Sequence, residues 1–558
     1  MCSPMNLAQI HQAIAGAHPD RECIITPHKR LTFGQVADRA LRLANVLHAH
    51  GLGAHRERAS LAGHESGQDH LGIYMLNCPE YIESMLGSYQ ARVAPFNVNY
   101  RYVDDELKYL FEDADAVAVI YQARYAPTLA RIRPSLPKLR LLIQLADESG
   151  EPLLPGAIDY EEALAGAPST PAPVTPSPDD LYIIYTGGTT GAPKGVLWRQ
   201  EDIYHAAMSG QPPGIPGHPT IDVLLEQVKN GGLLRVLATP PLMHGAAQWV
   251  SFGAMNTSGT VVLQGKPERL DPDDVWGLIE REKCNSLTIV GDAFARPLLE
   301  ALDRKTYDLS SLFIVGSGGA ILSPHNKEAF LKHIPNGLVI DGFGASETGA
   351  QGSHATSGKD RAQTGKFAMS GALVLKQDLS GPLASGADET GWLARSGHVP
   401  LGYYKDAAKT ARTFPTIGAT RYAVPGDHAR VLADGTIEVL GRGSVCINSG
   451  GEKIYPEEIE QVLRKHPDVY DAVVVGTPDD RFGERVTAVV QPRGGVTLTH
   501  ESLAAFAASS LARYKLPKST VLVEQMVRSP SGKPDYRWAK AEAMKILARR
   551  VDTGPVGA

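Results

Sequence analysis

The sequence predicts an α/β fold, with a large N-terminal domain of packed α/β subdomains and a small α+β domain at the C-terminus. Strand and helix patterns alternate along the first part of the chain, as in parallel sheets that are covered by helices. One strand pattern runs into a glycine-rich loop, and a separate set of helices and strands follows residue 441. The chain of 558 residues is also too long for a single domain with one core, since a typical domain has about 150 residues.

The first alternating segments lie in the N-terminal quarter of the chain. Residues 31–51 space their apolar side chains by three and four positions and end at a glycine, which predicts an amphipathic helix. The same reasoning predicts helices over 81–91 and 104–113. The apolar runs 93–98 and 116–121 predict short buried strands.

Two stretches predict loops, and one position predicts a domain boundary. Residues 152–178 are rich in Pro, Ala, Ser and Thr, which is typical of a surface connector, and residues 210–218 form a second loop-rich interruption. A boundary at residue 441 would separate a larger domain, 1–441, from a smaller one, 442–558. The smaller domain is expected to contain helices at 456–465 and 501–511 and strands at 471–476 and 485–491.

Composition and charge exclude several classes of protein. With 43% apolar and 21% charged residues, the chain is expected to be globular rather than disordered. The net charge of −6 argues against a nucleic-acid partner, and no apolar run approaches the ~18 residues of a membrane span. Five scattered cysteines and the lack of a signal-peptide pattern predict a cytoplasmic protein without a disulfide scaffold. A homodimer is expected on base rate alone.

The glycine-rich loop follows an apolar strand pattern at residues 181–185 and reads TGGTTGAPKG. Glycines allow backbone N–H groups to converge on one anion, threonine hydroxyls add donors, and a lysine adds a positive charge. The pattern differs from a Walker loop, because a proline precedes the lysine and a glycine follows it. The expected phosphate ligands are Thr186, Gly187, Gly188, Thr189, Thr190, Gly191 and Lys194.

Six motifs, in this order, resemble those of the adenylate-forming (ANL) superfamily, which contains acyl-CoA synthetases, luciferases and peptide-synthetase adenylation domains. They are the glycine-rich loop, GSGGAILS at 316–323, DGFGASETG at 341–349, PGDHARV at 425–431, GRGSVCINSGGEKIYPEEIE at 441–460 and SPSGK at 529–533. The resemblance implies the ANL fold, with residues 1–441 as the AMP-binding domain and residues 442–558 as the mobile domain.

The resemblance implies a reaction in two halves and three catalytic residues. A carboxylate attacks the α-phosphorus of ATP and gives acyl-AMP and pyrophosphate, and a thiol then displaces AMP. Lys533 is the implied cation between the carboxylate and the α-phosphate, and His244 is the implied gate of the carboxylate pocket. Glu347, with Thr190, is the implied site of Mg²⁺ on the nucleotide phosphates, because Mg²⁺ prefers oxygen ligands.

Further motif positions are implied to bind ATP or AMP. Asp427 can accept hydrogen bonds from both ribose hydroxyls, Arg442 can bond ribose or phosphate, and Phe343 offers a flat face for adenine. Each has an ordinary structural alternative, which is a surface ion pair for the first two and core packing for the aromatic ring. The other implied nucleotide residues are Gly318, Gly319, Ala320, Asp341, Gly342, Gly344 and Ser346, and Ser346 stands where the family usually has threonine.

The acyl pocket and the thiol site complete the implied machinery. His244, Gln248 and Trp249 are candidate walls of the acyl pocket, with core packing as the alternative. For CoA, glycines after a serine would let the pantetheine arm lie close to the backbone, an aromatic ring would stack on adenine, and cations would meet the phosphates. The implied CoA residues are Ser449, Gly450, Gly451, Phe482, Tyr514, Lys515 and Lys518. Ser444 occupies a hinge position where the family usually has an acidic residue or lysine.

Together the motifs predict an enzyme, an AMP-forming acid–CoA ligase that uses ATP, Mg²⁺ and CoA. Stretches such as VGDAFARPLLEAL at 290–302 look like those of bacterial ligases for fatty or steroid side-chain acids. The alternatives are an acyl-AMP ligase that loads a separate carrier protein, a luciferase-type oxidase, and a nucleotide- or acyl-binding homologue without turnover. The joint presence of Lys533, Glu347 and Asp427 argues against the last alternative.

Overall fold

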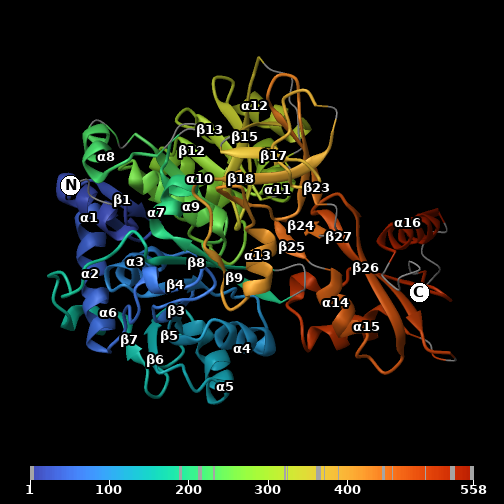
Figure 1. Ribbon diagram of the computed structural model, residues 1–558, viewed down its shortest axis with the longest axis horizontal. Coiled ribbons are helices and arrows are strands. Elements are labelled where there is room, and N and C mark those ends of the chain that lie inside the picture. Colours follow the sequence, from blue (N-terminus) through green and yellow to red (C-terminus); the bar gives the residue numbers. More distant parts are fainter. Residues whose placement is uncertain are drawn as a thin grey trace. The chain divides into compact units, whose positions relative to one another are not determined.

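The computed structural model describes residues 5–187, 192–211, 217–229, 231, 233–319, 322, 324–359, 366–369, 371–387, 389–442, 447–454, 456–494, 496, 498–527 and 535–552. The chain divides into two compact units, and each contains helices and strands (Figure 1). The first comprises Met1–Tyr100, Leu110–Thr186 and Gly195–Gly441. The second comprises Arg101–Tyr109, Gly187–Lys194 and Arg442–Ala558.

One sheet of the first unit has eight strands in the described part of the chain. Strands β8, β4, β3, β5, β6 and β7 run parallel, whereas β19 pairs antiparallel with β9. Parallel strands place their carboxyl ends at one edge, where ligands of open α/β sheets usually bind. The spatial order is β19 (Gly402–Tyr403), β9 (Pro193–Arg199), β8 (Leu181–Gly187), β4 (Ala94–Asn97), β3 (His70–Tyr74), β5 (Ala116–Gln122), β6 (Leu141–Leu145) and β7 (Ile158–Asp159).

A second, larger sheet changes character along its length. It is parallel from β1 through β11, β10, β12 and β13 to β14, and antiparallel beyond β14. The order is β2 (Arg30–Thr32), β1 (Glu22–Ile25), β11 (Thr260–Val262), β10 (Arg235–Ala238), β12 (Ser286–Ile289), β13 (Ile314–Ser317), β14 (Leu338–Ala345), β15 (Gly349–Ser357), β16 (Lys366–Met369), β23 (Ile437–Arg442), β22 (Asp427–Val431), β18 (Gly391–Ser396), β21 (Thr420–Ala423) and β20 (Thr416–Ile417), and β17 (Ala372–Leu375) pairs with β18.

Helices cover these sheets, and many of them lie in the connections between consecutive strands. They are α1 (Leu7–Ala17), α2 (Phe33–Ala49), η1 (Arg58–Ser60), α3 (Pro79–Gln90), α4 (Asp104–Asp113), η2 (Ala123–Tyr125), α5 (Ala126–Ile132), η3 (Arg133–Ser135), α6 (Tyr160–Gly166), α7 (Gln200–Ile203), the π-helix η4 (Tyr204–Met208), α8 (Ile221–Val228), α9 (Gly245–Asn256), α10 (Pro272–Glu282), α11 (Gly291–Arg304), α12 (Pro324–His333) and α13 (Ala407–Thr413). Residues of α4 belong to both units.

The predicted early elements are confirmed, with one difference at a helix start. Helices α3 and α4 and strands β4 and β5 cover the predicted segments within three residues. The helix expected from residue 31 begins at Phe33, because Thr32 and Gln35 form a capping box there. The Thr32 hydroxyl accepts from the Gln35 N–H, and the Gln35 side chain accepts from the Thr32 N–H. Leu31 is part of β2.

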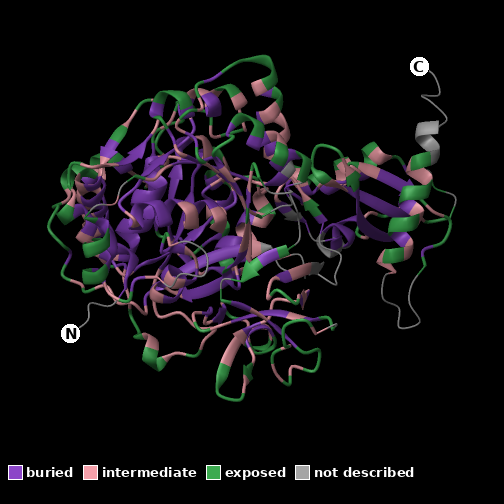
Figure 2. Cartoon of the chain, turned by 90° about the horizontal axis from the view of Figure 1, so that it is seen from above, coloured by how far each residue is buried: buried purple, intermediate pink, exposed green. Residues whose placement is uncertain are grey.

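Two large apolar cores hold the first unit together. One lies between α1, α2, α3 and α9 and the faces of both sheets, with Phe33, Tyr81 and Trp198 fully buried. The other packs α10, α11 and α12 on the parallel part of the larger sheet, around Trp276 and Phe330. Figure 2 shows that many strands are buried in the interior, whereas helices at the surface carry exposed residues. Burial of one large apolar side chain, such as that of Phe33, stabilises the fold by roughly 1.5–3 kcal/mol of transfer free energy.

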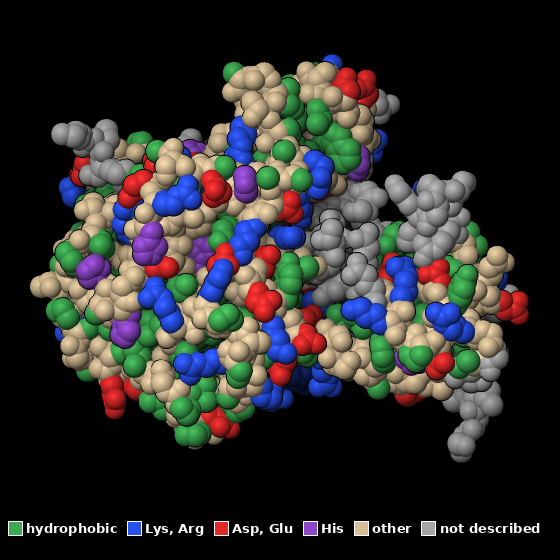
Figure 3. All heavy atoms as spheres, turned by 60° about the horizontal axis from the view of Figure 1, so that its bottom comes forward, with side chains coloured by type: hydrophobic (Ala, Val, Ile, Leu, Met, Phe, Trp, Pro, Cys, Tyr) green, Lys and Arg blue, Asp and Glu red, His purple; other side chains and the backbone are tan. Residues whose placement is uncertain are grey.

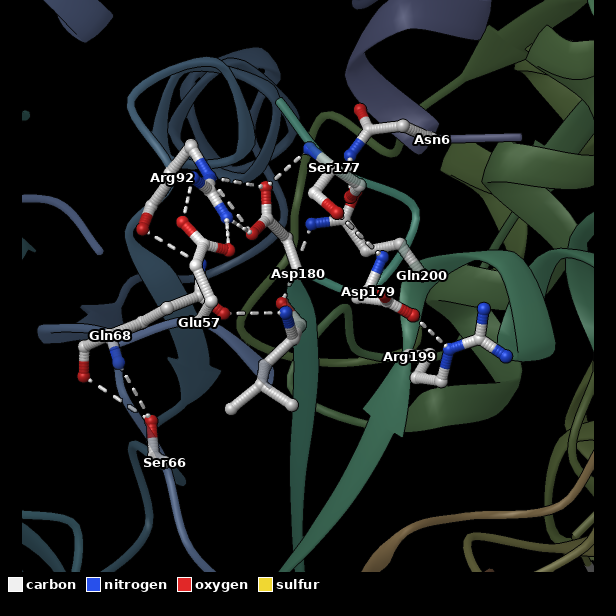
Figure 4. A network of polar contacts seen from close by, with 11 residues as sticks. Asn6, Glu57, Ser66, Gln68, Arg92, Ser177, Asp179, Asp180, Arg199 and Gln200 are labelled. Atoms are coloured by element: carbon white, nitrogen blue, oxygen red, sulfur yellow. Dashed lines mark hydrogen bonds and ion pairs between the residues drawn. The ribbon is translucent and has the colours of Figure 1, made fainter. Parts of the chain in front are cut away.

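The predicted surface connector is only partly irregular. Strand β7 and helix α6 form within residues 152–178, where the sequence predicted no element, because the Asp159 carboxylate caps α6. The end of the connector is fixed by a polar network (Figure 4). The Arg92 guanidinium bonds the buried Asp180 at 2.9 Å and Glu57 at 2.8 Å. This network sets the start of β8, the strand that leads to the glycine-rich loop.

The second unit contains a sheet that is covered on both faces. Alternate residues of β26 pack in opposite directions, Val474 toward α14 and α15 and Val475 toward α16. The sheet order is β25 (Glu452–Ile454), β24 (Ile447–Ser449), β27 (Gly483–Pro492) and β26 (Val469–Asp479), with β28 (Ser519–Leu522) parallel to β27. The helices are α14 (Pro456–Leu463), α15 (His500–Ala508), η5 (Arg513–Lys515) and α16 (Tyr536–Asp552). These confirm the predicted helices and strands.

The surface carries charges of both signs. On the face shown in Figure 3, Lys and Arg side chains are interspersed with Asp and Glu side chains. Among the described residues, none of the helices is both long and apolar enough to span a membrane.

Candidate active site

Glu347 lies on a tight turn between β14 and β15. The Thr348 N–H donates to the Ala345 carbonyl and the Ala345 N–H donates to the Thr348 hydroxyl, both at 3.0 Å. Gly349 follows with φ +67°, and a Cβ there would stand 2.9–3.0 Å from Ala206. Only glycine avoids both the backbone strain and the collision, so the turn positions Glu347 through local constraints.

Two contacts hold this turn from outside. The Trp198 indole N–H donates to the Ser346 carbonyl at 2.8 Å. The Tyr403 hydroxyl donates to Oε1 of Glu347 at 2.8 Å, and both of these side chains are buried. Trp198 is on β9 and Tyr403 on β19, so a pair of adjacent strands fixes the carboxylate.

Glycines bring the ends of β13 and β14 together. The two strands are parallel, and Ser317 pairs with Asp341. A Cβ on Gly318 would lie 3.4 Å from the Gly342 carbonyl, and Gly319 has φ +80°. The predicted adenine-side residues 318–319 and 341–344 therefore lie next to each other at the carboxyl edge of the parallel sheet. This is where a nucleotide base is expected in an α/β sheet.

Two side chains of this region make contacts with other parts of the protein. Asp341 is buried and forms an ion pair of 2.9 Å with Lys327 of α12, whose ammonium is fully buried. Phe343 is half-buried and packs against Phe367, with ring centroids 4.6 Å apart. Part of the Phe343 ring is therefore covered by the protein itself.

Asp427 is the first residue of β22 and is half-buried. The preceding Gly426 has φ +101°, a conformation that side-chain-bearing residues rarely adopt. The glycine turns the chain into β22, so the carboxylate stands at a strand start.

His244 occupies the N-cap position of α9, after β10, and is half-buried. Two buried asparagines fix the loop before it. Asn77 donates to the Pro240 carbonyl and accepts from the Leu242 N–H. Asn97 donates to the carbonyls of Tyr185 and Met243, and accepts from the Tyr185 N–H. Asn97 thus ties the end of β8 to the residue before His244.

Gln248 and Trp249 belong to one buried polar network. The Tyr182 hydroxyl donates to Gln248 at 2.7 Å, and the Gln248 amide donates to the Leu242 carbonyl at 2.8 Å. The Trp249 indole N–H donates to the Tyr182 hydroxyl at 3.2 Å. Gln248 is 3% exposed, and its amide lies in the core. Trp249 is half-buried, and its ring lies against Gly245.

Comparison with known proteins decides the family. Residues 11–404 match the AMP-binding enzyme family, and residues 458–533 match the AMP-binding enzyme C-terminal domain. The chain belongs to the AMP-binding enzyme family. The predicted membership of the adenylate-forming superfamily and the predicted fold class are confirmed.

Individual relatives of this AMP-binding enzyme cover nearly its whole length. The medium-chain acyl-CoA ligase Mig of Mycobacterium avium is 52% identical over 538 residues, 96% of this chain and 98% of the relative. The 3-oxocholest-4-en-26-oate–CoA ligase of Rhodococcus rhodochrous is 41% identical over 547 residues, 96% and 95% of the two chains. The amide bond synthetase McbA of Marinactinospora thermotolerans shares the fold, with a TM-score of 0.77 at 22% identity over 96% and 99% of the chains. The curated names agree with the predicted acid–CoA ligase activity.

The donor set of the AMP-binding enzyme fits Mg²⁺ bound together with nucleotide phosphates. The ion takes six oxygen ligands and usually keeps several waters, so one or two carboxylates suffice when phosphates complete the shell. Glu347 supplies a buried carboxylate that is already oriented by Tyr403. No cluster of three or more metal-ligating side chains occurs among the residues that the structure describes.

The predicted phosphate loop is described only at its ends. Thr186 is the sixth residue of β8 and half-buried, and Lys194 is the second residue of β9 and half-buried. Gly187 ends β8. The remaining predicted positions Gly188, Thr189, Thr190, Gly191, Ala320, Ser444 and Lys533 lie outside the described residues, as does the side chain of Arg442. Residues 212–216 of the second predicted loop lie outside them as well.

Four predicted CoA residues of the AMP-binding enzyme come together in the second unit. Ser449 pairs with Gly483, and the Gly450 N–H donates to the Phe482 carbonyl at 3.0 Å. Gly450 and Gly451 both have positive φ. Phe482 is 39% exposed, and the guanidinium of Arg481 lies 5.1 Å from its ring centroid.

The other three predicted CoA residues, Tyr514, Lys515 and Lys518, differ in how far they are exposed. Lys518 is exposed and Tyr514 is half-buried. Lys515 is buried, and its ammonium forms an ion pair of 2.9 Å with Glu106, in the stretch 101–109 that belongs to the same unit. In this conformation the charge of Lys515 is compensated by the protein itself.

Several residues that shape the site were missed from the sequence. These residues are Tyr403, which contacts Glu347, Lys327, which contacts Asp341, and Asn97, which holds the residue before His244. None of the three belongs to a recognised motif. The asparagine carried the best signal, because a polar side chain in the apolar strand pattern 93–98 must find buried partners. The other two carried no local signal, since their partners are distant in sequence.

Proposed function

We propose that the protein is an AMP-forming acid–CoA ligase that activates a carboxylic acid as acyl-AMP and then forms the acyl-CoA thioester. The observation that carries the proposal is the 52% identity, over nearly the whole length of both chains, to a medium-chain acyl-CoA ligase. The arrangement of Glu347 beside the adenine-side glycines supports it, because both belong to one continuous segment, β14 and its turn.

In the adenylation half, the difficulty is to bring an anionic carboxylate to an anionic phosphate. We assign Lys194 and Lys533 as cations that neutralise phosphate oxygens, and Lys533 as the charge shared with the acyl carboxylate. Glu347 would hold Mg²⁺, with Thr190, and the ion would neutralise phosphate charge when bound. Asp427 would accept the ribose hydroxyls, and Asp341 and Phe343 would contact adenine.

In the thioester half, a thiol displaces AMP from the acyl-AMP. His244, at the N-cap of α9, would separate the acyl carboxylate from the incoming thiol. The pantetheine arm would lie against the backbone of residues 449–451, because the two glycines among them carry no side chain that would block it. Phe482 would stack on the CoA adenine, and Lys518 would contact its phosphates. Ser444 would act at the hinge between residues 1–441 and 442–558.

The acid itself is proposed from the names of the relatives. A medium-chain fatty acid is the first candidate, following the name of the 52% relative. A steroid side-chain acid is the second, because relatives at 40–42% identity carry that name. We further propose a cytoplasmic enzyme that acts as a homodimer, which light scattering of the purified protein would test.

Acid-dependent ATP–pyrophosphate exchange tests the proposal. Exchange is expected with medium-chain fatty acids or steroid side-chain acids and not without acid, and Lys533→Ala is expected to abolish it. Lys540→Ala is the matched control, because Lys540 is an exposed lysine of the same unit that pairs with Glu484. Thioester formation must then occur with free CoA. Transfer to a carrier protein alone, or undiminished exchange in Lys533→Ala, would contradict the assignment.

A further inference from the structure

We propose that Tyr403 is a positioning residue for the carboxylate of Glu347, and that it fixes this carboxylate for Mg²⁺–nucleotide binding. The inference rests on the proposed function, since it assigns a role within the same site. Tyr403 belongs to none of the six motifs and is 56 residues away from Glu347 in sequence. The contact is therefore a product of the fold.

The contact is short and shielded from water. The Tyr403 hydroxyl donates to Oε1 of Glu347 at 2.8 Å, and the two residues are 2% and 7% exposed. A hydrogen bond to an ionised carboxylate is about twice as strong as one between neutral groups, and low polarity strengthens it further. The bond fixes the rotation of the carboxylate about its own axis, which the backbone turn alone does not determine.

The donor is itself held in place. Tyr403 pairs with Val196 across β19 and β9, and the Tyr403 N–H donates to the Thr410 hydroxyl at 2.9 Å. Gly402 allows this approach, because a Cβ there would meet Thr410 at 2.6–2.7 Å. The position of the Tyr403 side chain is thus determined by the pairing of β19 with β9 and by Thr410 in the middle of α13.

A cation increases the donor strength of the phenol. The ammonium of Lys409 lies 4.1 Å from the centroid of the Tyr403 ring. Positive charge over the ring draws electron density from the oxygen, which polarises the O–H bond toward Glu347. The ring also packs against Phe414, with centroids 5.6 Å apart. Lys409 therefore supports the contact between Tyr403 and Glu347.

The consequence concerns metal geometry. Mg²⁺ demands near-ideal octahedral coordination at 2.0–2.1 Å, so a rotated carboxylate binds it poorly. Removal of a partner that orients a metal ligand typically lowers metal affinity or activity by about 10–100-fold. Tyr403 acts on the reaction only through Glu347, and its loss should first change the metal dependence.

Tyr403→Phe tests the inference, and Tyr404→Phe is its matched control. The neighbouring Tyr404 also donates its hydroxyl to a carboxylate, Asp115, at 2.8 Å, so both variants delete one such bond. Two readouts are used: the Mg²⁺ dependence of ATP–pyrophosphate exchange, and Mn²⁺ binding to the protein–ATP complex by electron paramagnetic resonance. Thermal unfolding of each variant checks the fold.

For Tyr403→Phe we expect about a 10-fold weaker half-saturation by Mg²⁺ and weaker Mn²⁺ binding. Tyr404→Phe should keep both within about twofold, and both variants should unfold near the wild-type temperature. Unchanged metal dependence in Tyr403→Phe, or equal changes in both variants, would overturn the inference. The two proposals can fail separately. If the wild-type protein catalyses no exchange, but Tyr403→Phe still binds Mn²⁺ more weakly than wild type, the proposed function is refuted and the inference about Tyr403 stands.

Discussion

Lys327 and Asp341 form an ion pair of 2.9 Å in which the lysine side chain is completely buried. The aspartate begins the segment that is proposed to surround adenine, and the lysine is on α12, which packs against the same sheet. A buried charge is tolerated only when its partner is present, so each residue makes the other acceptable. Helix α12 and the nucleotide segment are thereby coupled.

Lys327→Met should destabilise the protein strongly, by about 3–5 kcal/mol, because it leaves the Asp341 carboxylate buried without its cation. Urea unfolding monitored by circular dichroism measures the change. The double variant with Asp341→Asn should recover part of the loss. Lys266→Met, which removes an exposed lysine paired with Asp271, should leave the unfolding midpoint unchanged. Equal effects of the two lysine substitutions would contradict the argument.

Asn97→Ala should lower both stability and activity. The substitution leaves the Tyr185 N–H and two carbonyl groups without their amide partner, at a cost of about 1–3 kcal/mol for each buried group. Because the loop before His244 loses its support, the KM for the acid should rise more than the KM for ATP. Thermal unfolding and exchange kinetics report these effects. Asn45→Ala removes a more exposed asparagine from α2 and serves as the control.

Gly349→Ala should displace Glu347. The residue has φ +67°, where a side chain costs about 1–3 kcal/mol, and the new Cβ would collide with Ala206. Acid-dependent exchange should fall at least 10-fold, since outer support of a metal ligand is worth that much. Gly277→Ala is the control, because nothing lies within 4 Å of a Cβ there; it should stabilise α10 by up to about 1 kcal/mol.

Acid should destabilise the protein through two buried histidines. Burial lowers the pKa of His11 and of His70 to about 4, below the ordinary value of about 6.5. Between these values the unfolded chain binds more protons than the folded one. The free energy of unfolding is therefore highest above about pH 6.5. It falls as the pH drops toward 4, by roughly 3 kcal/mol for each histidine ring.

His11→Leu isolates one of these terms. In the described part of the chain neither ring nitrogen of His11 has a hydrogen-bond partner, and the ring stacks on Phe33 at 5.4 Å. The variant should be at least as stable as wild type at pH 8 and should lose less stability between pH 6 and 4.5. Urea unfolding at several pH values measures both. His28→Leu, at an exposed position, should keep the wild-type slope.

Phe482→Ala should affect only the thioester half of the reaction. Stacking of an aromatic ring on a base contributes about 1–3 kcal/mol, so the KM for CoA should rise about 5- to 150-fold. ATP–pyrophosphate exchange should not change, because CoA takes no part in it. Tyr470→Ala removes another exposed aromatic residue of the same unit and is the control. A parallel loss of exchange in Phe482→Ala would place the ring elsewhere in the mechanism.

Local patterns predicted the fold class well because they depend on residues that are close in sequence. The 3.6-residue periodicity of α3 and α4, the apolar runs of β4 and β5 and the glycines before and after Glu347 all act within a few positions. The capping box at Thr32 and the cap of α6 at Asp159 were available in the sequence too. They were missed because apolar periodicity and composition outweighed them.

By itself, the sequence determined the order of the motifs, the type of chemistry and the strand that leads into the glycine-rich loop. Only the tertiary structure decided which side chains complete these motifs. Tyr403 reaches Glu347 because β19 pairs with β9, Lys327 reaches Asp341 because α12 packs on β14, and Lys515 is compensated by Glu106. The physical reason is that a buried polar group must find a partner, and the order of strands and the packing of helices select that partner over distances that no local pattern encodes.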